Sequence, residues 1–489
     1  MVSSLFGRFQ ALLVHPDPRR QRRAILAVLI LVGVIIGLVI GLAGPAIALA
    51  LVVVAIGGGL VIRSPLWGLV GIVAVATLLP FATLPFKIGF TPTFLNVAVF
   101  ATLAVWAFTY ATRTETRLEV SAIGGLVALF LGLAVLAFAL GLRHARPTPN
   151  HLRQFLEMVL SIILFFVVIN TVRTRAQLVF LARVLMLGGT AAAAFGVLFY
   201  ILPREVTVWI LNRLTRLGYP GGFGALRFVN DDPDGLMRAI GTSVDPNVLG
   251  GLMVLVGVFT ATQAAATMPL FRRRWVLLML GLQGLCLYLT ISRGSMLGFV
   301  IGLLAIGILR YRRLVLLLGL GGLLFFVLPL TQDYVQHLLA GFAGQDRATQ
   351  MRFGEYRDAL TLISRYPLFG VGFVGTPEIG LYIGVSSLYL LMAEEMGLVG
   401  LSVFLLLMAA FVNALLVALR RRPQPPLEAL LLGVLGSMIG LLAAGVFDHY
   451  LFNLTYPHMT ALLWVLIGLG MATVRQTRSS QPATGARVP

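Results

Sequence analysis

The sequence predicts an all-α integral membrane protein, a polytopic helical bundle of about 12–14 transmembrane helices with a helical outer loop domain that caps a cavity. Hydrophobic residues make up 59% of the 489 residues and charged residues only 11%, a composition typical of polytopic membrane proteins. Lipid-facing backbone must be helical, because unpaired amides are costly in hydrocarbon and no series of short alternating strands indicates a barrel.

The apolar stretches are each about long enough to cross a hydrocarbon core of roughly 30 Å. They cover residues 24–42, 45–62, 66–84, 93–112, 121–142, 154–172, 177–201, 247–267, 274–291, 295–309, 314–330, 398–419, 427–447 and 458–474. The first follows basic residues, as a signal peptide would. It is longer than the usual apolar region of about 7–15 residues, and a second stretch follows almost at once. We therefore interpret it as the first membrane helix.

These stretches divide the chain into membrane and loop segments. The expected order is a basic cytoplasmic N-terminus (1–23), N-terminal transmembrane helices (24–201), an outer loop (202–246), further transmembrane helices (247–330), a large outer, periplasmic-side loop (331–397), C-terminal transmembrane helices (398–474) and a disordered cytoplasmic tail (475–489). The single cysteine, Cys286, lies in an apolar stretch, where it forms no intrachain disulfide and no cysteine-based metal site by itself. We expect no metal and no cofactor.

The basic residues orient the chain. Arginine supplies 36 of the 37, Lys87 being the exception. Arginine clusters stand at every second gap between the apolar stretches, and cytoplasmic loops are the ones that carry excess basic residues. The clusters are at residues 19–23, 63, 113–117, 173–175, 272–274, 310–313, 420–422 and 475–478. This alternation predicts a multi-pass protein of the bacterial inner membrane with both termini in the cytoplasm.

The opposite gaps nevertheless contain 13 arginines, which insertion into the membrane does not favour. They are Arg143, Arg146, Arg153, Arg204, Arg213, Arg216, Arg227, Arg238, Arg293, Arg347, Arg352, Arg357 and Arg365. A polyanionic substrate handled on the outer face would explain them. The net charge of +19 is scattered over short loops, and without a basic domain it does not indicate nucleic-acid binding.

The polar motifs gather in the outer gaps. The first loop contains Arg-Ala-Ile-Gly-Thr-Ser-Val-Asp-Pro-Asn at 238–247, and Ser-Arg-Gly at 292–294 opens a tight helical hairpin. The long loop contains Arg352, the turn Pro-Leu-Phe-Gly-Val-Gly at 367–372, and Tyr-Leu…Glu-Met-Gly-Leu-Val-Gly at 389–400.

In their order and placement these motifs resemble the O-antigen ligase and polymerase superfamily, the GT-C-type enzymes of bacterial envelope glycan assembly. The resemblance covers roughly residues 230–475. Asp-His-Tyr at 448–450 is also similar to some members. The N-terminal half resembles the family only in its hydropathy pattern.

The resemblance implies a metal-independent, inverting glycosyl transfer on the outer side of the membrane. The donor would be a glycan on undecaprenyl diphosphate, and the acceptor a sugar hydroxyl on a lipid-linked glycan or lipid A core. The residues suit this chemistry, because guanidinium groups stay charged and bind phosphate oxygens in a fork. Charge grows on the departing lipid diphosphate in the transition state, and fixed cations stabilise it there.

We expect Arg238, Arg293, Arg352, Glu395 and His449 to be catalytic. The diphosphate and glycan should be bound by Arg238, Arg293, Arg352, Arg357 and Tyr389. Structural alternatives exist for several of these residues. Arg293 would snorkel to the interface, Arg357 would pair locally with Glu355 or Asp358, and Glu395 would cap a helix.

The sequence departs from the family at one point. Ligases usually show His-Asn before the Tyr-Leu pair, where this chain has Ser386 and Ser387. A serine has no pKa suited to a general base near neutral pH. Either another group takes the proton, or a dissociative transition state needs no base. The candidate replacements are Glu378, Glu395, His337, His449 and Asp245. The departure favours a polymerase-type or other glycan transferase over a lipid A core ligase.

Two other classes compete with the enzyme. An organic-anion or bicarbonate-linked transporter would also use many spans and arginines, but its path would place ionisable residues in the span centres, where this sequence has few. A scaffold of an envelope assembly complex leaves the outer arginines unexplained. The partners expected of the enzyme are the lipid-linked donor and acceptor and membrane lipids.

Overall fold

The computed structural model describes residues 56–84, 89–112, 118–328, 347–375 and 384–479, with a few single residues outside these ranges. The expected N-terminus, the apolar stretch 24–42, His337, Glu378 and most of the tail lie outside the described residues. The chain divides into two compact units, Met1–Ser64 and Pro65–Pro489. In the first unit residues 56–63 are helical, and all that follows concerns the second.

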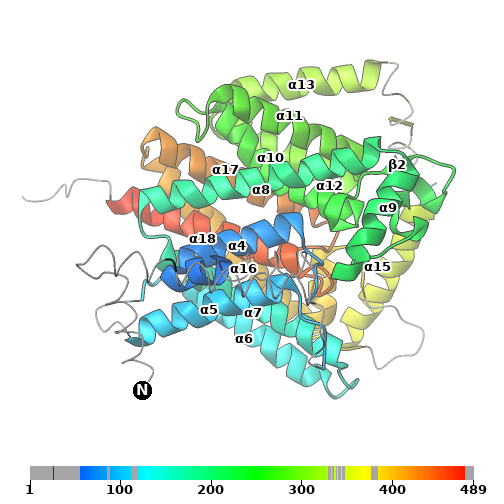
Figure 1. The fold of residues 1–489 in the computed structure, drawn as a ribbon, viewed down its shortest axis with the longest axis horizontal. Coiled ribbons are helices and arrows are strands. Elements are labelled where there is room, and N and C mark those ends of the chain that lie inside the picture. The colour runs from blue at the N-terminus through cyan, green and yellow to red at the C-terminus, as the bar shows by residue number, and fades with distance from the viewer. Residues whose placement is uncertain are drawn as a thin grey trace, which may run out of the picture. The chain divides into compact units, whose positions relative to one another are not determined.

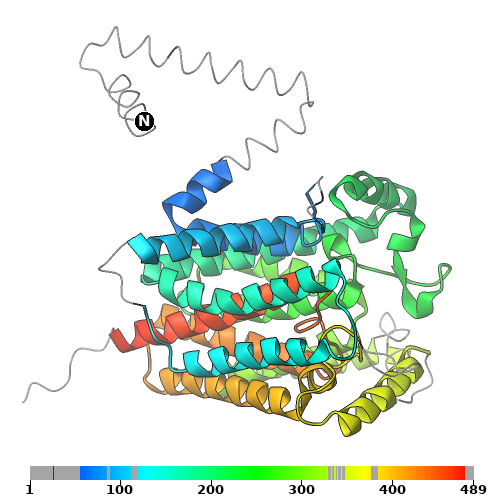
Figure 2. The same cartoon turned by 90° about the horizontal axis from the view of Figure 1, so that it is seen from below.

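The second unit is a bundle of helices that run back and forth (Figure 1), as the view turned by 90° also shows (Figure 2). Its helices of ten residues or more are α4 (Pro65–Leu78), α5 (Phe94–Thr112), α6 (Gly124–Gly141), α7 (Pro149–Thr171), α8 (Arg175–Ile201), α9 (Arg204–Leu214), α10 (Pro246–Ala265), α11 (Arg273–Thr290), α12 (Arg293–Leu309), α13 (Arg312–Val327), α15 (Arg347–Arg365), α16 (Leu388–Arg420), α17 (Pro425–Ala444) and α18 (Pro457–Ser479).

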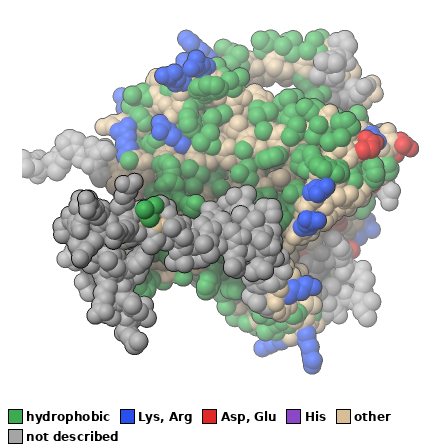
Figure 3. Space-filling model, in the orientation of Figure 1, with side chains coloured by type: hydrophobic (Ala, Val, Ile, Leu, Met, Phe, Trp, Pro, Cys, Tyr) green, Lys and Arg blue, Asp and Glu red, His purple; other side chains and the backbone are tan. Residues whose placement is uncertain are grey.

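These helices make the chain a polytopic helical membrane protein, as the sequence predicts. Among the described residues, eight helices are long and apolar enough to cross a membrane, and α4 and α12 are shorter apolar helices. Every apolar stretch expected between residues 66 and 474 contains a helix. Hydrophobic side chains cover most of the described face in Figure 3.

The loop that joins α8 to α10 contains the short elements. Four 3₁₀ turns lie there, η1 (Thr215–Leu217), η2 (Phe223–Ala225), η3 (Val229–Asp231) and η4 (Gly241–Ser243). Two strands, β1 (Arg227–Phe228) and β2 (Met237–Arg238), form an antiparallel ribbon in which Arg227 pairs with Arg238. A small core of its own, built on Phe199, Val208 and Leu226, supports this loop.

Small residues bring α12 and α17 close together. A Cβ added at Gly298 would lie 2.5 Å from the carbonyl oxygen of Gly440, and one at Gly302 would lie 2.7 Å from that of Gly436. Membrane helices use such small residues four positions apart to approach, since lipid gives no hydrophobic drive to associate. The contact fixes the start of α12, where Arg293 lies, relative to the end of α17.

The long helix α16 is broken at Gly397, whose backbone has φ 68° and ψ −178°. The turn 367–372 packs into this break, and its Gly370, also at φ 68°, faces the backbone of α16. Four backbone hydrogen bonds join the two, from Val371 N to Glu394 O (2.8 Å), Gly372 N to Glu395 O (3.0 Å), Leu398 N to Pro367 O (2.7 Å) and Val399 N to Leu368 O (3.3 Å). The turn thus satisfies polar groups that would otherwise be costly in a membrane helix.

Two of the segment boundaries expected from the sequence differ from the observed helices. The membrane helix expected at 398 continues a helix that already begins at Leu388. Within the large loop expected at 331–397, the described part includes α15, a 19-residue helix that packs against α16, as well as the turn 367–372 and the start of α16. We call the end of the bundle that carries residues 202–245, 347–375, 384–387 and 445–456 the loop end. In both ribbon views α9 and α15 lie there.

Candidate functional site

Arg238 lies on β2, where its guanidinium group is held by two helices. Nε donates to the carbonyl oxygen of Thr290 at the end of α11 (2.8 Å), and Nη2 donates to Oδ1 of Asn247 in the first turn of α10 (2.7 Å). The neighbouring amide of Ala239 donates to Leu289 O (2.8 Å). These contacts place Arg238 at the mouth of the hairpin formed by α11 and α12.

The first turn of α10 is closed by its own cap. Oδ1 of Asp245 accepts from the amides of Asn247 (2.8 Å) and Val248 (3.0 Å), and Pro246 occupies the first helical position. Asp is a favoured N-cap residue and proline a favoured first residue of a helix. This cap fixes the position from which Asn247 reaches Arg238.

The hairpin mouth carries Arg293 as the first residue of α12. Ile291 adopts the left-handed conformation that reverses the chain. Ser292 Oγ then donates to Ser295 Oγ (3.0 Å), and Ser295 Oγ lies 3.5 Å from the carbonyl oxygen of Asn247. A Cβ added at Gly294 would lie 2.9 Å from Cβ of Phe447. Arg293 therefore emerges beside both α10 and the chain that leads to Asp448.

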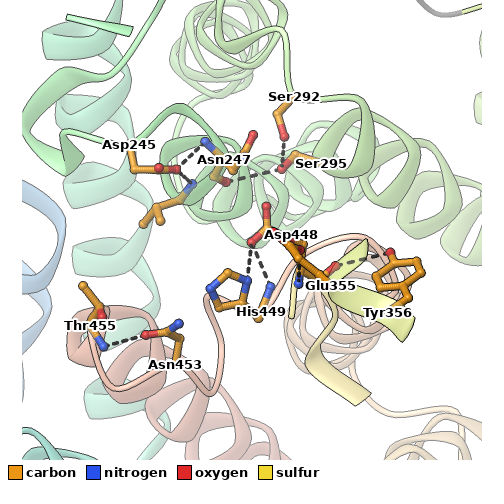
Figure 4. Close-up of polar contacts among 12 residues, drawn as sticks. Asp245, Asn247, Ser292, Ser295, Glu355, Tyr356, Asp448, His449, Asn453 and Thr455 are labelled. Carbon is orange, nitrogen blue, oxygen red and sulfur yellow. Dashed lines mark hydrogen bonds and ion pairs between the residues drawn. The ribbon is translucent and has the colours of Figure 1, made fainter. Parts of the chain in front are cut away.

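Asp448 lies at the centre of the residues drawn in Figure 4, between Asn247 and Ser295 on one side and Glu355 on the other. Its Oδ1 accepts from the amide of His449 (2.8 Å) and lies 3.6 Å from Nδ1 of His449. Burial raises the pKa of the Asp448 carboxyl, and Asp245 raises it further, while His449 and Arg352 lower it. The two basic side chains are therefore close enough to interact electrostatically with this carboxyl.

Arg352 comes from α15 and lies on the same face as Glu355 and Tyr356, three and four residues later. Glu355 Oε2 accepts from the amide of Ser386 (3.0 Å), and the hydroxyl of Tyr356 donates to the carbonyl oxygen of Ser386 (3.4 Å). Burial raises the pKa of Tyr356; Glu355 and Asp448 add to this rise, and Arg352 opposes it. Arg352 thus faces the Asp448 side of the cluster.

Four segments far apart in sequence therefore meet at the loop end. They contribute Arg238, Arg293, Arg352 and the pair Asp448–His449. The serine pair 386–387, which stands where the family usually has His-Asn, adjoins them through Glu355 and Tyr356. The amide of Leu388 also donates to the carbonyl oxygens of Gly445 (2.8 Å) and Asp448 (3.0 Å). The arrangement combines the fixed guanidinium group of Arg238 and the nearby Arg352 with the largely buried carboxyl of Asp448.

The side chains of the other expected residues make different contacts. The hydroxyl of Tyr389 donates to the carbonyl oxygen of Leu442 (2.7 Å) and so joins α16 to α17. Arg357 is exposed on α15. The side chain of Glu395 is buried at the break in α16, and its Oε2 has no hydrogen-bond partner among the described residues. It is the neighbouring Glu394 that lies near Glu355 and Asp358 of α15.

Among the arginines expected at outer gaps, Arg143 and Arg146 are exposed between α6 and α7. Arg153 instead forms an ion pair with Glu157, one turn further along α7, and both side chains are largely buried. Removing one partner of such a pair leaves an uncompensated buried charge. Arg153 therefore has a structural role within the bundle.

Sequence reasoning missed three members of the cluster. Asn247 is only the last residue of the motif at 238–247, Glu355 a possible local partner of Arg357, and Asp448 part of a family-like triplet. Each touches residues that are distant in sequence, so no local pattern marks it. Within the described residues, no three His, Cys, Asp or Glu side chains gather as a metal-binding group.

The fold and the cluster define a multi-pass membrane protein with a polar, arginine-bearing site at one end of its bundle. Residues 275–405 match the family model of the O-antigen ligases, which confirms the resemblance to the O-antigen ligase and polymerase superfamily. The match runs from α11 to the first half of α16 and includes Arg293, Arg352 and the break at Gly397. No curated protein matches the chain. The helices thus make the chain a multi-pass membrane protein, and the matched part of it is similar to the O-antigen ligases.

Proposed function

We propose that the chain is a glycosyltransferase that moves a glycan from undecaprenyl diphosphate to a sugar hydroxyl on a lipid-linked acceptor. The transfer is of the O-antigen ligase or of the O-antigen and exopolysaccharide polymerase type, inverting and independent of metal. The observation that supports it most is that Arg352 lies near the Asp448 carboxyl at the end of the bundle where Arg238 and Arg293 also stand, within and next to the matched ligase domain.

The arginines would stabilise the leaving group. As the bond between the anomeric carbon and the diphosphate oxygen breaks, negative charge grows on the lipid diphosphate. Each charge-assisted hydrogen bond contributes about 1.5–3 kcal/mol, so two or three that tighten in the transition state lower the barrier by several kcal/mol. Arg238 suits this role because two hydrogen bonds already fix its guanidinium group.

Asp448 would receive the proton. The acceptor hydroxyl oxygen attacks the anomeric carbon on the face opposite the diphosphate, which inverts that carbon, and the hydroxyl proton passes to the Asp448 carboxylate. A base acts best when its pKa lies near the working pH, and burial moves the pKa of Asp448 upward in that direction. Asp448 thus takes the place of the histidine that Ser386–Ser387 lack.

The proposal includes an orientation. With the loop end on the outer face of the cytoplasmic membrane, the arginine clusters at 173–175, 272–274, 310–313 and 420–422 face the cytoplasm, in accord with the positive-inside bias. Lipid-linked glycans carried to the outer leaflet would then meet the cluster directly.

A transfer assay at varied pH tests the function and the role of Asp448 together. Purified protein, given a lipid diphosphate glycan donor and a lipid-linked acceptor, should release lipid diphosphate and lengthen the acceptor. Because burial raises the pKa of Asp448, wild-type transfer should fall as the pH drops through that raised value, where the carboxylate becomes protonated and can no longer accept a proton. Asp448→Asn should lose at least tenfold in rate and lack this pH limb.

The matched control is Asp234→Asn, an exposed carboxyl on the outer loop, which should transfer like wild type. Transfer by Asp448→Asn at the wild-type rate and pH profile would exclude Asp448 as the base. Vesicles that take up an organic anion while no acceptor is lengthened would argue for a transporter instead of the proposed enzyme.

A further inference from the structure

A concave pocket lies in the loop between α8 and α10, beside the two-stranded ribbon that carries Arg238. It has a volume of about 470 Å³ and is lined by Arg204, Glu205, Phe223, Gly224, Leu226, Arg227, Phe228, Asp231 and Pro233. Pockets for small ligands have volumes of this order. At the end of the bundle that carries β2, acidic and basic side chains lie next to one another (Figure 3).

Contacts among its own residues hold the walls of this pocket in place. Arg204 lies over the ring of Phe228, with Cζ 5.0 Å from the ring centroid, and its Nη1 donates to the carbonyl oxygen of Pro233 (3.1 Å). Arg227 Nη1 donates to Gly224 O (3.1 Å). Leu226 is buried in the small core of the loop, and Phe228 packs against that core. Little of the pocket has to become ordered when a ligand binds, which favours affinity.

The lining suits a sugar chain. A pyranose ring has apolar faces of C–H groups and a rim of hydroxyls. Phe223, which is 59% exposed, offers an aromatic face for the apolar side of such a ring, since aromatic side chains supply large rigid contact area. Glu205 and Asp231 can accept hydrogen bonds from hydroxyls and Arg227 can donate to them. This mixture of one aromatic surface and both kinds of charge does not match a plain anion or a lipid tail.

The ribbon connects this pocket to the arginine cluster. Arg227 lines the pocket and pairs directly with Arg238 across the two strands. Paired residues in an antiparallel ribbon have Cα atoms about 4.5–5.5 Å apart. A chain of sugars whose reacting end lies at Arg238 can therefore reach the pocket after very few residues.

We propose that this pocket is a binding subsite for the glycan chain, one that holds sugars away from the bond being formed. The inference rests on the proposed glycosyl transfer and names the part of the substrate that the outer loop recognises. The glycan could belong to the donor or to the acceptor, since both have the same chemistry. A subsite of this kind would raise the affinity for long glycans more than for short ones.

The test measures binding apart from catalysis. The probe is the oligosaccharide mixture released by mild acid from polyprenyl diphosphate lipids of cells that produce the protein, and binding to the full chain is followed by saturation-transfer NMR. Phe223→Ala should weaken binding at least tenfold, and Phe223→Tyr should retain it. Leu236→Ala is the matched control, because Leu236 is 60% exposed on the same loop and does not line the pocket.

The same variants are then compared in transfer with short and long glycans. Phe223→Ala should raise the KM for the long donor or the long acceptor and leave kcat and the short substrates unchanged, and the substrate affected identifies the source of the glycan. Binding by Phe223→Ala equal to wild type would overturn the subsite, even if transfer is intact. Binding that depends on Phe223 in a chain that transfers nothing would support the subsite and overturn the proposed function.

Discussion

Replacing Arg293 with lysine is expected to lower the rate of glycan transfer at least tenfold while the protein still folds and inserts. Tenfold corresponds to about 1.4 kcal/mol of transition-state binding. Lysine keeps the positive charge and loses the planar fork that holds two phosphate oxygens. A side chain that only anchored the helix to the interface would tolerate this change. The position of Arg293 at the start of α12, which Gly298 and Gly302 hold against α17, makes the lost geometry costly.

The measurement is transfer from a purified lipid diphosphate donor, with each variant checked for monodispersity in detergent. Arg216→Lys serves as the control, because Arg216 is exposed in the outer loop 202–246 and is not part of the cluster. Near wild-type rates for both Arg293→Lys and Arg293→Ala would reduce Arg293 to a surface anchor.

Replacing Gly397 with alanine is expected to prevent stable folding of the loop end. A Cβ there would lie 2.1 Å from the carbonyl oxygen of Leu368 and 2.3 Å from its carbonyl carbon, and both are backbone atoms that cannot swing away. The positive φ of Gly397, combined with an extended ψ, adds roughly 1–3 kcal/mol for any residue with a Cβ. The turn 367–372 would have to separate from α16 and give up its hydrogen bonds. We expect a large fall in thermal stability and in the yield of monodisperse protein.

Gly354→Ala is the matched control for that experiment. Gly354 lies within α15, and an added Cβ meets nothing within 4 Å. Alanine there should be neutral or stabilise the helix by roughly 0.5–1 kcal/mol. If Gly397→Ala melted at the wild-type temperature and eluted as a single species, the packing of the turn into the broken helix would have to be different.

The helices were predictable because hydropathy along a single chain reports membrane spans directly. The break in α16 was not, because the apolar run continues through it and the hydrogen bonds that support it come from the separate turn 367–372. The candidate site was likewise only partly predictable, because it depends on contacts between distant segments. Arginines against the positive-inside bias marked Arg238, Arg293 and Arg352, but the burial that singles out Asp448 arises only when α10, α12 and α15 come together.

Tyr389 and Glu395 were expected in the site from the sequence, but their side chains have other surroundings. Both stand in a family-like motif, yet the Tyr389 hydroxyl is bonded to Leu442 and the Glu395 side chain is buried. The spacing of the motif predicts where these residues stand in the sequence. It does not predict which face of the helix packs against its neighbours. That orientation follows from packing between α16 and α17.

The two attachments of α15 to α16 have a consequence for local unfolding. Glu355 and Tyr356 hold the chain at Ser386, and the turn after α15 is hydrogen-bonded across the break between Glu394 and Val399. Neither helix end can open without disrupting the other, so the two should behave as one cooperative unit. Backbone amides of α15 between 355 and 365 should then exchange with solvent deuterium at rates like those of the first turns of α16. The order that fixes Arg352 would be established during folding, before any substrate arrives.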